Sequence, residues 1–132
     1  MSRSRWTFVM VVALSVGAAC SDAPTGVTQA GTVMLRLTTP HADDGAMMFE
    51  VSGPPIDTAV AVNGSVRLFT RRASSSTLVG VVVGAVANGA VVTLRVPDVG
   101  AAAGYTARVL EVADRQSTLR GSLAGYALTA GP

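Results

Sequence analysis

The side chains that could do chemistry are few in this chain, and three of them stand close together. His41 is the only histidine, and the acidic pair Asp43 and Asp44 follows it, just before Gly45. Two neighbouring carboxylates at a turn supply the hard oxygen ligands that calcium prefers. The competing interpretation, which we favour, is a solvated turn in which one aspartate bonds its own backbone. With a single histidine, a multi-histidine metal site is excluded, and we predict no metal site.

Two glutamates, Glu50 and Glu111, are the remaining candidates for acid–base chemistry. Both fall on predicted strands, at positions that a solvent-facing strand side also explains. The sequence contains no G-x-S-x-G, phosphate-loop or zinc-ligand spacing. Because no nucleophile stands beside a base, we predict no catalytic residue, no cofactor and no enzymatic activity.

The first 19 residues have the composition of an export signal. Arg3 and Arg5 give a basic start, residues 6–19 are apolar or small, and Cys20 follows directly. A basic start, a short apolar run and small residues before a cleavage point are the features of secretory signal peptides. The apolar run is shorter than the roughly 20 residues that a membrane-spanning helix needs. Residues 1–19 are therefore predicted to be a cleaved signal peptide.

Cys20 is the single cysteine, and the stretch Val16-Gly17-Ala18-Ala19-Cys20 resembles the lipobox of bacterial lipoproteins. That family usually has a large aliphatic residue where this chain has Gly17, and its cysteine is lipidated and becomes the new N-terminus. The resemblance implies a lipid anchor on Cys20 and a place in the bacterial cell envelope. Ser21 directly follows the cysteine. A serine at this position resembles that of lipoproteins sent to the outer membrane, where the anchored protein lies on the periplasmic or the surface side. The alternative is an ordinary cleavage site that leaves Cys20 as a free thiol.

The charges beyond the signal argue against a nucleic-acid partner. The formal net charge of the chain is +2 at pH 7, and Arg3 and Arg5 account for that surplus. From Cys20 onward 8 arginines stand against 8 acidic residues, so the predicted mature chain is formally neutral. A neutral chain lacks the basic footprint that binding to phosphates requires.

The remaining sequence divides into a short polar segment and one β-rich domain. Residues 20–31 are small and polar, which predicts a flexible tether. In residues 32–132 apolar and polar residues alternate with a period of two, as in Val33-Leu35-Leu37 and Met47-Phe49-Val51. A helical turn is expected near residues 101–103. This pattern predicts an all-β fold, a single antiparallel β-sandwich of seven to nine strands.

Two Asn-Gly pairs predict the tight turns of this sandwich. Asn63-Gly64 and Asn88-Gly89 each lie between valine-rich runs, and Asn-Gly supplies the positive φ angles of two-residue hairpins. We predict hairpins that join residues 58–62 to 65–70 and residues 77–87 to 90–96. The apolar run 78–94 could instead be a membrane helix, but its length is marginal and Asn88-Gly89 interrupts it.

Aromatic content separates two classes of binding function. Sugar-binding sandwiches commonly present exposed Trp or Tyr side chains, and the only tryptophan, Trp6, lies in the predicted signal. Phe49 and Phe69 stand at strand positions that predict burial in the core. A protein-binding or structural module is therefore preferred, with a carbohydrate-binding module as the alternative.

The order of the strand signals resembles that of cohesin-type modules, the β-sandwiches that bind dockerin modules on bacterial surfaces. The resemblance covers residues 33–129 and rests on Phe49-Glu50-Val51, on the strand 89–96, and on the closing segments 111–114 and 126–129. It implies a cohesin-like or immunoglobulin-like sandwich that binds another envelope or surface protein. It transfers no binding residue, and it leaves the partner and the oligomeric state open.

Overall fold

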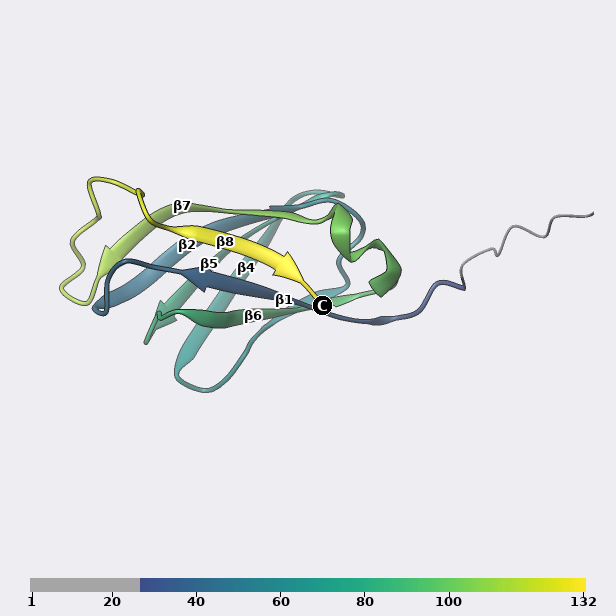
Figure 1. Ribbon diagram of the computed structural model, residues 1–132, viewed down its shortest axis with the longest axis horizontal. Helices are drawn as coiled ribbons and strands as arrows, with labels where there is room; N and C mark the ends of the chain where they lie inside the picture. The colour runs from purple at the N-terminus through teal and green to yellow at the C-terminus, as the bar shows by residue number, and fades with distance from the viewer. Residues whose placement is uncertain (1–26) are drawn as a thin grey trace, which may run out of the picture.

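Two antiparallel sheets of four strands each make up most of the computed structural model, which describes residues 27–132. One sheet has the strand order β3-β6-β1-β8 and the other has the order β4-β5-β2-β7 (Figure 1). The strands are β1 (Gly31–Thr38), β2 (Asp44–Ser52), β3 (Thr58–Ala61), β4 (Val66–Ser74), β5 (Thr77–Gly84), β6 (Gly89–Val96), β7 (Thr106–Asp114) and β8 (Ala127–Gly131).

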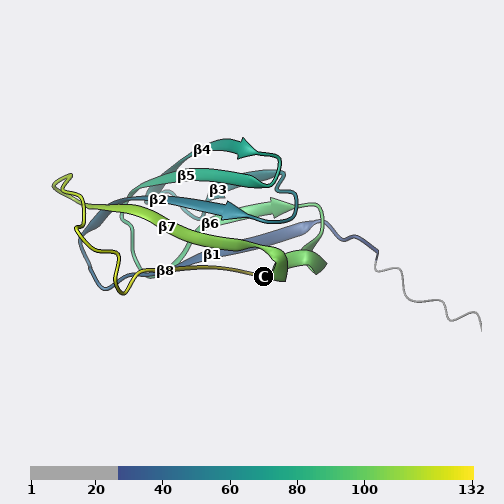
Figure 2. The same ribbon diagram turned by 90° about the horizontal axis from the view of Figure 1, so that it is seen from above.

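The two sheets face each other and bury their apolar sides between them (Figure 2). In β1 and β2 every second side chain points into this core and is at most 2% exposed: Val33, Leu35, Leu37, Met47, Phe49 and Val51. Period-two alternation produces this arrangement because successive side chains of a strand point to opposite faces. The prediction of an antiparallel β-sandwich is confirmed, with eight strands in the predicted range.

A short 3-10 helix, η1 (Val99–Gly104), connects β6 to β7 and confirms the helical turn expected there. The side chain of Asp98 caps it by accepting a hydrogen bond from the amide of Gly100 at 2.9 Å. Tyr105 follows, is buried, and donates its hydroxyl proton to the carbonyl of Pro55 at 2.6 Å. Among residues 27–132 no helix is long and apolar enough to cross a membrane.

The two Asn-Gly hairpins predicted from the sequence are wrong, because each pair lies where the chain crosses from one sheet to the other. β3 and β4 belong to different sheets, and so do β5 and β6. Neither Asn63 nor Asn88 has the positive φ of a two-residue hairpin turn. Their side chains are used instead: Asn63 accepts a hydrogen bond from the amide of Ser65 at 2.9 Å, and Asn88 accepts one from the amide of Thr39 at 2.7 Å.

The tight hairpin that the structure contains joins β4 to β5, with Ser74 opposite Thr77. In this hairpin the prediction that Phe69 lies in the core is wrong, since its side chain is 60% exposed. Phe69 is opposite Val81, whereas Leu68 is opposite Val82, which is fully buried. Residues directly opposite each other share a face. Leu68 therefore points inward and Phe69 points outward.

The two ends of the domain lie close together, because β8 pairs with β1 and places Gly131 opposite Met34 (Figure 1). Residues 27–30, which belong to the predicted tether, are exposed and precede β1. The carbonyl of Gln29 accepts a hydrogen bond from the amide of Val99 at 2.8 Å. The predicted signal peptide (residues 1–19) and Cys20 lie outside the described residues.

Candidate functional site

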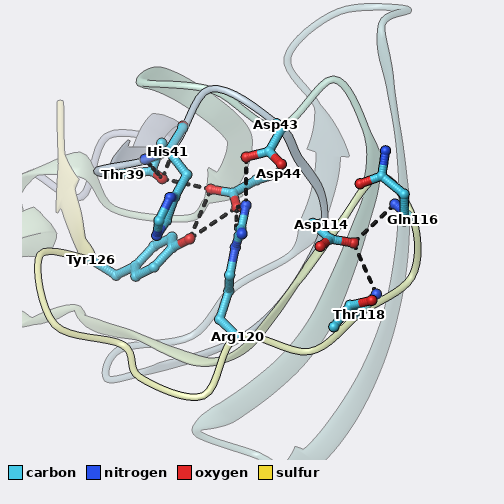
Figure 3. A network of polar contacts seen from close by, with 9 residues as sticks. All are labelled: Thr39, His41, Asp43, Asp44, Asp114, Gln116, Thr118, Arg120 and Tyr126. Carbon is cyan, nitrogen blue, oxygen red and sulfur yellow. Dashed lines mark hydrogen bonds and ion pairs between the residues drawn. The ribbon is translucent and has the colours of Figure 1, made fainter.

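The aspartate pair lies at one end of the sandwich, where the connection between β1 and β2 meets the connection between β7 and β8 (Figure 3). Asp44 begins β2 and has no exposed surface. The interpretation of this segment as a solvated turn is therefore wrong for Asp44. A buried carboxylate must be compensated by hydrogen bonds and opposite charge, so its partners decide what the site can do.

Three side chains compensate the carboxylate of Asp44. Arg120 donates to Oδ1 from Nε at 3.1 Å and from Nη2 at 2.8 Å. The hydroxyl of Tyr126 donates to the same carboxylate, lying 2.9 Å and 3.0 Å from its two oxygens. The hydroxyl of Thr39 donates to Oδ2 at 2.5 Å. Both carboxylate oxygens are therefore engaged.

Asp43 shares the guanidinium of Arg120, whose Nη2 lies 2.7 Å from Asp43 Oδ1. This second carboxylate is half exposed. In the calcium alternative the two carboxylates would both bind a metal cation. In the structure they both bind the guanidinium of Arg120 instead. No group of three or more His, Cys, Asp or Glu side chains in the described part of the chain is arranged to hold a metal ion.

The hydrogen bonds fix the protonation states of this cluster. Burial opposes ionisation of Asp44, but the hydrogen bonds from Thr39, Arg120 and Tyr126 outweigh it and hold the pKa of this carboxyl below its ordinary value of 3.8. The hydrogen bond from Arg120 likewise lowers the pKa of Asp43. Burial raises the pKa of Tyr126. At neutral pH the cluster therefore holds two carboxylates, one guanidinium and a neutral phenol.

This cluster fastens the long connection between β7 and β8 to the body of the domain. Nearby, Asp114 Oδ1 accepts hydrogen bonds from the amides of Gln116 and Thr118, both at 2.9 Å. The ring of His41 lies 5.9 Å from the ring of Tyr126, centroid to centroid.

An arginine does not release its proton at neutral pH, and both oxygens of the Asp44 carboxylate already accept hydrogen bonds. The arrangement suits a structural clamp, which is made of Thr39, Asp43, Asp44, Arg120 and Tyr126.

The two glutamates considered for acid–base chemistry lie on the outer face of the sheet that contains β2 and β7. Glu50 forms an ion pair with Arg108 on the neighbouring strand at 3.0 Å. Glu111 is exposed and lies opposite Met48. Neither has a serine, threonine or cysteine among its recorded hydrogen-bond partners in residues 27–132.

A hollow of about 570 Å³ lies at the same end of the domain as the clamp. Gly45, Gly84 and several alanines line it, together with Asp114, Arg115 and Ser117. The Oδ1 atom of Asp114 is already bound to two backbone amides. In residues 27–132 no side-chain hydrogen bond joins the hydroxyl of Ser117 to this carboxylate.

The feature that sequence reasoning missed is the outer face of the β4–β5 hairpin. Along β4 the outward residues are Arg67, Phe69 and Arg71, and all three are exposed. They lie opposite the outward valines of β5, which are Val83, Val81 and Val79. Of these, Val83 is 42% exposed. We call these six residues the outer β4–β5 face. Because Val66 and Leu68 point inward, the residues that alternate with them point outward and form this face. This alternation along the sequence is the signal that could have revealed it.

Phe69 is the one exposed Phe, Tyr or Trp side chain among residues 27–132. An exposed phenylalanine between two arginines has the composition of a protein interface, since aromatic and arginine side chains are enriched there relative to the rest of the surface. Comparison of the chain with protein-family models, with curated proteins and with solved structures finds no match.

Proposed function

We propose that this chain is an exported, lipid-anchored protein of the bacterial cell envelope whose β-sandwich binds another protein and catalyses no reaction. The observation that carries the binding role is the outer β4–β5 face, where Phe69 is 60% exposed between two arginines. Covering such a side chain with a partner removes apolar surface from water, which favours association.

The anchor rests on the first 20 residues and on the lipobox resemblance at Cys20. One acyl chain holds a protein to a bilayer only marginally, whereas two or more hold it stably. In a lipoprotein the cysteine provides both a thiol and a new amino group for acylation. Residues 27–30 are exposed and without regular structure, which suits a tether between the anchor and the sandwich. The cohesin resemblance supports a protein as the partner.

The carbohydrate alternative depends on the same aromatic side chain. Phe69 could stack against a sugar ring, and Arg67 and Arg71 could donate hydrogen bonds to its hydroxyl groups. A single phenylalanine gives a smaller platform than the Trp and Tyr side chains that such sites usually present. The protein partner is therefore preferred.

The intact mass of the chain purified from bacterial membranes tests the anchor. We expect a mature N-terminus at Cys20 that carries acyl chains. A mature Cys20 with a free thiol would refute the anchor. Membrane sedimentation of a Cys20→Ser variant is a weaker test, because an unprocessed precursor keeps its apolar segment and also sediments.

Capture of partners from envelope extract tests the binding role. The wild-type chain is compared with Phe69→Ser and with the control Leu119→Ser, which removes another exposed apolar side chain, 63% exposed, from the β7–β8 connection. We expect one partner protein to be retained by the wild type and by Leu119→Ser, and lost from Phe69→Ser. Equal capture by all three chains, or no capture at all, contradicts the proposal. A glycan array that shows binding dependent on Phe69 favours the carbohydrate alternative.

A further inference from the structure

β4 is an edge strand with a free row of backbone groups. It pairs with β5 on one side only and ends the strand order of its sheet (Figure 2). Its nine residues extend over roughly 30 Å at about 3.3 Å per residue. Along an unpaired edge about half of the N–H and C=O groups point away from the sheet. In the described part of the chain no backbone hydrogen bond from another segment reaches this edge of β4.

The edge of β4 is also open on both faces of its sheet. Every residue from Phe69 to Ser74 is exposed, including Thr70 and Arg72, which point toward the other sheet. The facing edge strand, β3, is only four residues long and leaves this part of β4 uncovered. Arg72 donates to the carbonyls of Ile56 and Asp57, so its guanidinium holds the segment before β3 and is not free for a partner.

The charge of β4 indicates the chemistry of an added strand. β4 contains Arg67, Arg71 and Arg72 and no acidic residue. A second copy of the chain paired through β4 would bring three further arginines against these three, and like charges on adjacent strands repel. Charged side chains on an edge commonly prevent self-pairing in this way. An acidic strand would meet attraction at the same positions.

On the basis of the proposed function, we propose that the edge of β4 binds an extended acidic segment of the partner protein, which continues the sheet as a fifth strand. Backbone hydrogen bonds supply the affinity of such strand addition, and alternate side chains supply the specificity. Acidic side chains at two alternate positions would face Arg67 and Arg71. An apolar side chain between them would cover Phe69.

The first experiment measures binding of a fluorescent peptide, TETVTET, to the full chain in detergent, with TKTVTKT as the charge-reversed peptide. We expect the acidic peptide to bind and the basic peptide not to bind. The double variant Arg67→Glu/Arg71→Glu should weaken binding of the acidic peptide about tenfold or more. Neither arginine has a recorded hydrogen bond or ion pair among residues 27–132, so the variant should keep the fold, which circular dichroism checks.

The matched control is Arg36→Glu/Arg95→Glu, which makes the same change of net charge on exposed positions of the other sheet. This control should bind the acidic peptide as the wild type does. Equal loss in both double variants would show that only net charge matters, and no binding of TETVTET to the wild type would mean that β4 takes no such strand. Either result overturns the proposal.

The second experiment tests the backbone pairing. Methylation of alternate amide nitrogens blocks one edge of a peptide strand, so two forms of TETVTET are made, each blocked on one edge. We expect one form to lose binding and the other to keep it. If both forms bind equally, the contact does not involve strand addition. If instead vesicles of phosphatidylglycerol bind in a manner that depends on Arg67 and Arg71 while the peptide does not, β4 contacts a membrane and the proposal is wrong.

The outcomes separate this proposal from the proposed function. Suppose that the envelope partner is captured by the wild type, and that capture resists both Arg67→Glu/Arg71→Glu and an excess of TETVTET. The protein-binding role then stands and strand addition at β4 fails. If no partner is captured in a manner that depends on Phe69, the protein-binding role itself fails.

Discussion

Asp44 and Arg120, 76 residues apart in the sequence, form an ion pair in which the carboxylate has no exposed surface, with Nη2 of Arg120 2.8 Å from Oδ1 of Asp44. The pair joins the start of β2 to the connection between β7 and β8 (Figure 3). Removal of one member of a buried pair leaves the other without compensation. The clamp is therefore expected to matter more for stability than the more exposed ion pair of Glu50 and Arg108.

Replacement of Asp44 by alanine should lower the free energy of unfolding by about 3 kcal/mol, because Arg120, Thr39 and Tyr126 lose their common acceptor in a buried place. Urea unfolding followed by circular dichroism measures the effect. The control Glu111→Ala removes an exposed carboxylate and should change the free energy by less than about 0.5 kcal/mol. Similar midpoints for the two variants would contradict the importance of the clamp.

Stability should also fall in acid because of Asp44. Its pKa in the folded protein lies below 3.8, the ordinary value that it regains on unfolding. Its contribution to stability is therefore complete above the unfolded pKa and is lost as the pH falls through the folded pKa. Urea unfolding of the wild type should show this loss below about pH 4, whereas Asp44→Asn should be less stable at neutral pH and less sensitive to acid. An equal acid sensitivity of both chains would place the cause in other carboxyl groups.

The two Asn-Gly pairs should respond differently to the same substitution. Gly89 has a φ of 114°, a conformation that alanine adopts with difficulty, whereas Gly64 does not have a positive φ. Neither site has atoms within 4 Å of an added Cβ, so only backbone strain separates them. Gly89→Ala should lower the free energy of unfolding by about 1 kcal/mol or more, and Gly64→Ala should change it by less than about 0.5 kcal/mol. Thermal melting compares the two, and equal losses would mean that backbone strain at Gly89 is not the cause.

Gly80 should resist enlargement because it faces a core side chain. A Cβ added there would overlap the ring of Phe49, which has no exposed surface. Gly80→Ala is expected to cost about 1 to 3 kcal/mol of stability by overpacking. Phe49→Leu removes the ring, so in that background Gly80→Ala should cost much less. A double-mutant cycle measures the coupling energy between the two substitutions. Additive effects on the free energy of unfolding would mean that the two residues do not interact.

The sandwich could be predicted from the sequence because a strand with one covered face has alternating apolar and polar residues. Val33, Leu35 and Leu37 show this pattern, and all three are buried as expected. The same rule applied to Phe69 fails, because hydrophobicity alone does not decide which of the two alternating sets points inward. In β4 that choice is made by Val66 and Leu68, and the residues beyond them have no facing strand to cover them.

The clamp and the sheet crossings could not be predicted from local patterns. Two of the three partners of Asp44, Arg120 and Tyr126, are 76 and 82 positions away on a connection without periodicity. The third, Thr39, is five positions away and would equally suit a solvated turn. For the Asn-Gly pairs the local signal was misleading. The side chain of Asn88 binds the amide of Thr39, 49 residues away, and this contact replaces the turn that the dipeptide alone favours.

The pairing of β8 with β1 determines how the domain can be joined to other chains. Gly131 lies opposite Met34, so the last strand ends about 10 Å from where the first begins, at roughly 3.3 Å per residue. A domain with neighbouring ends can be inserted into a surface loop of a host protein, or circularly permuted, while its strands stay in place. A permuted chain that links residue 132 to residue 31 through glycines and opens between Ser75 and Ser76 would keep both sheets and would turn β4 into the terminal strand.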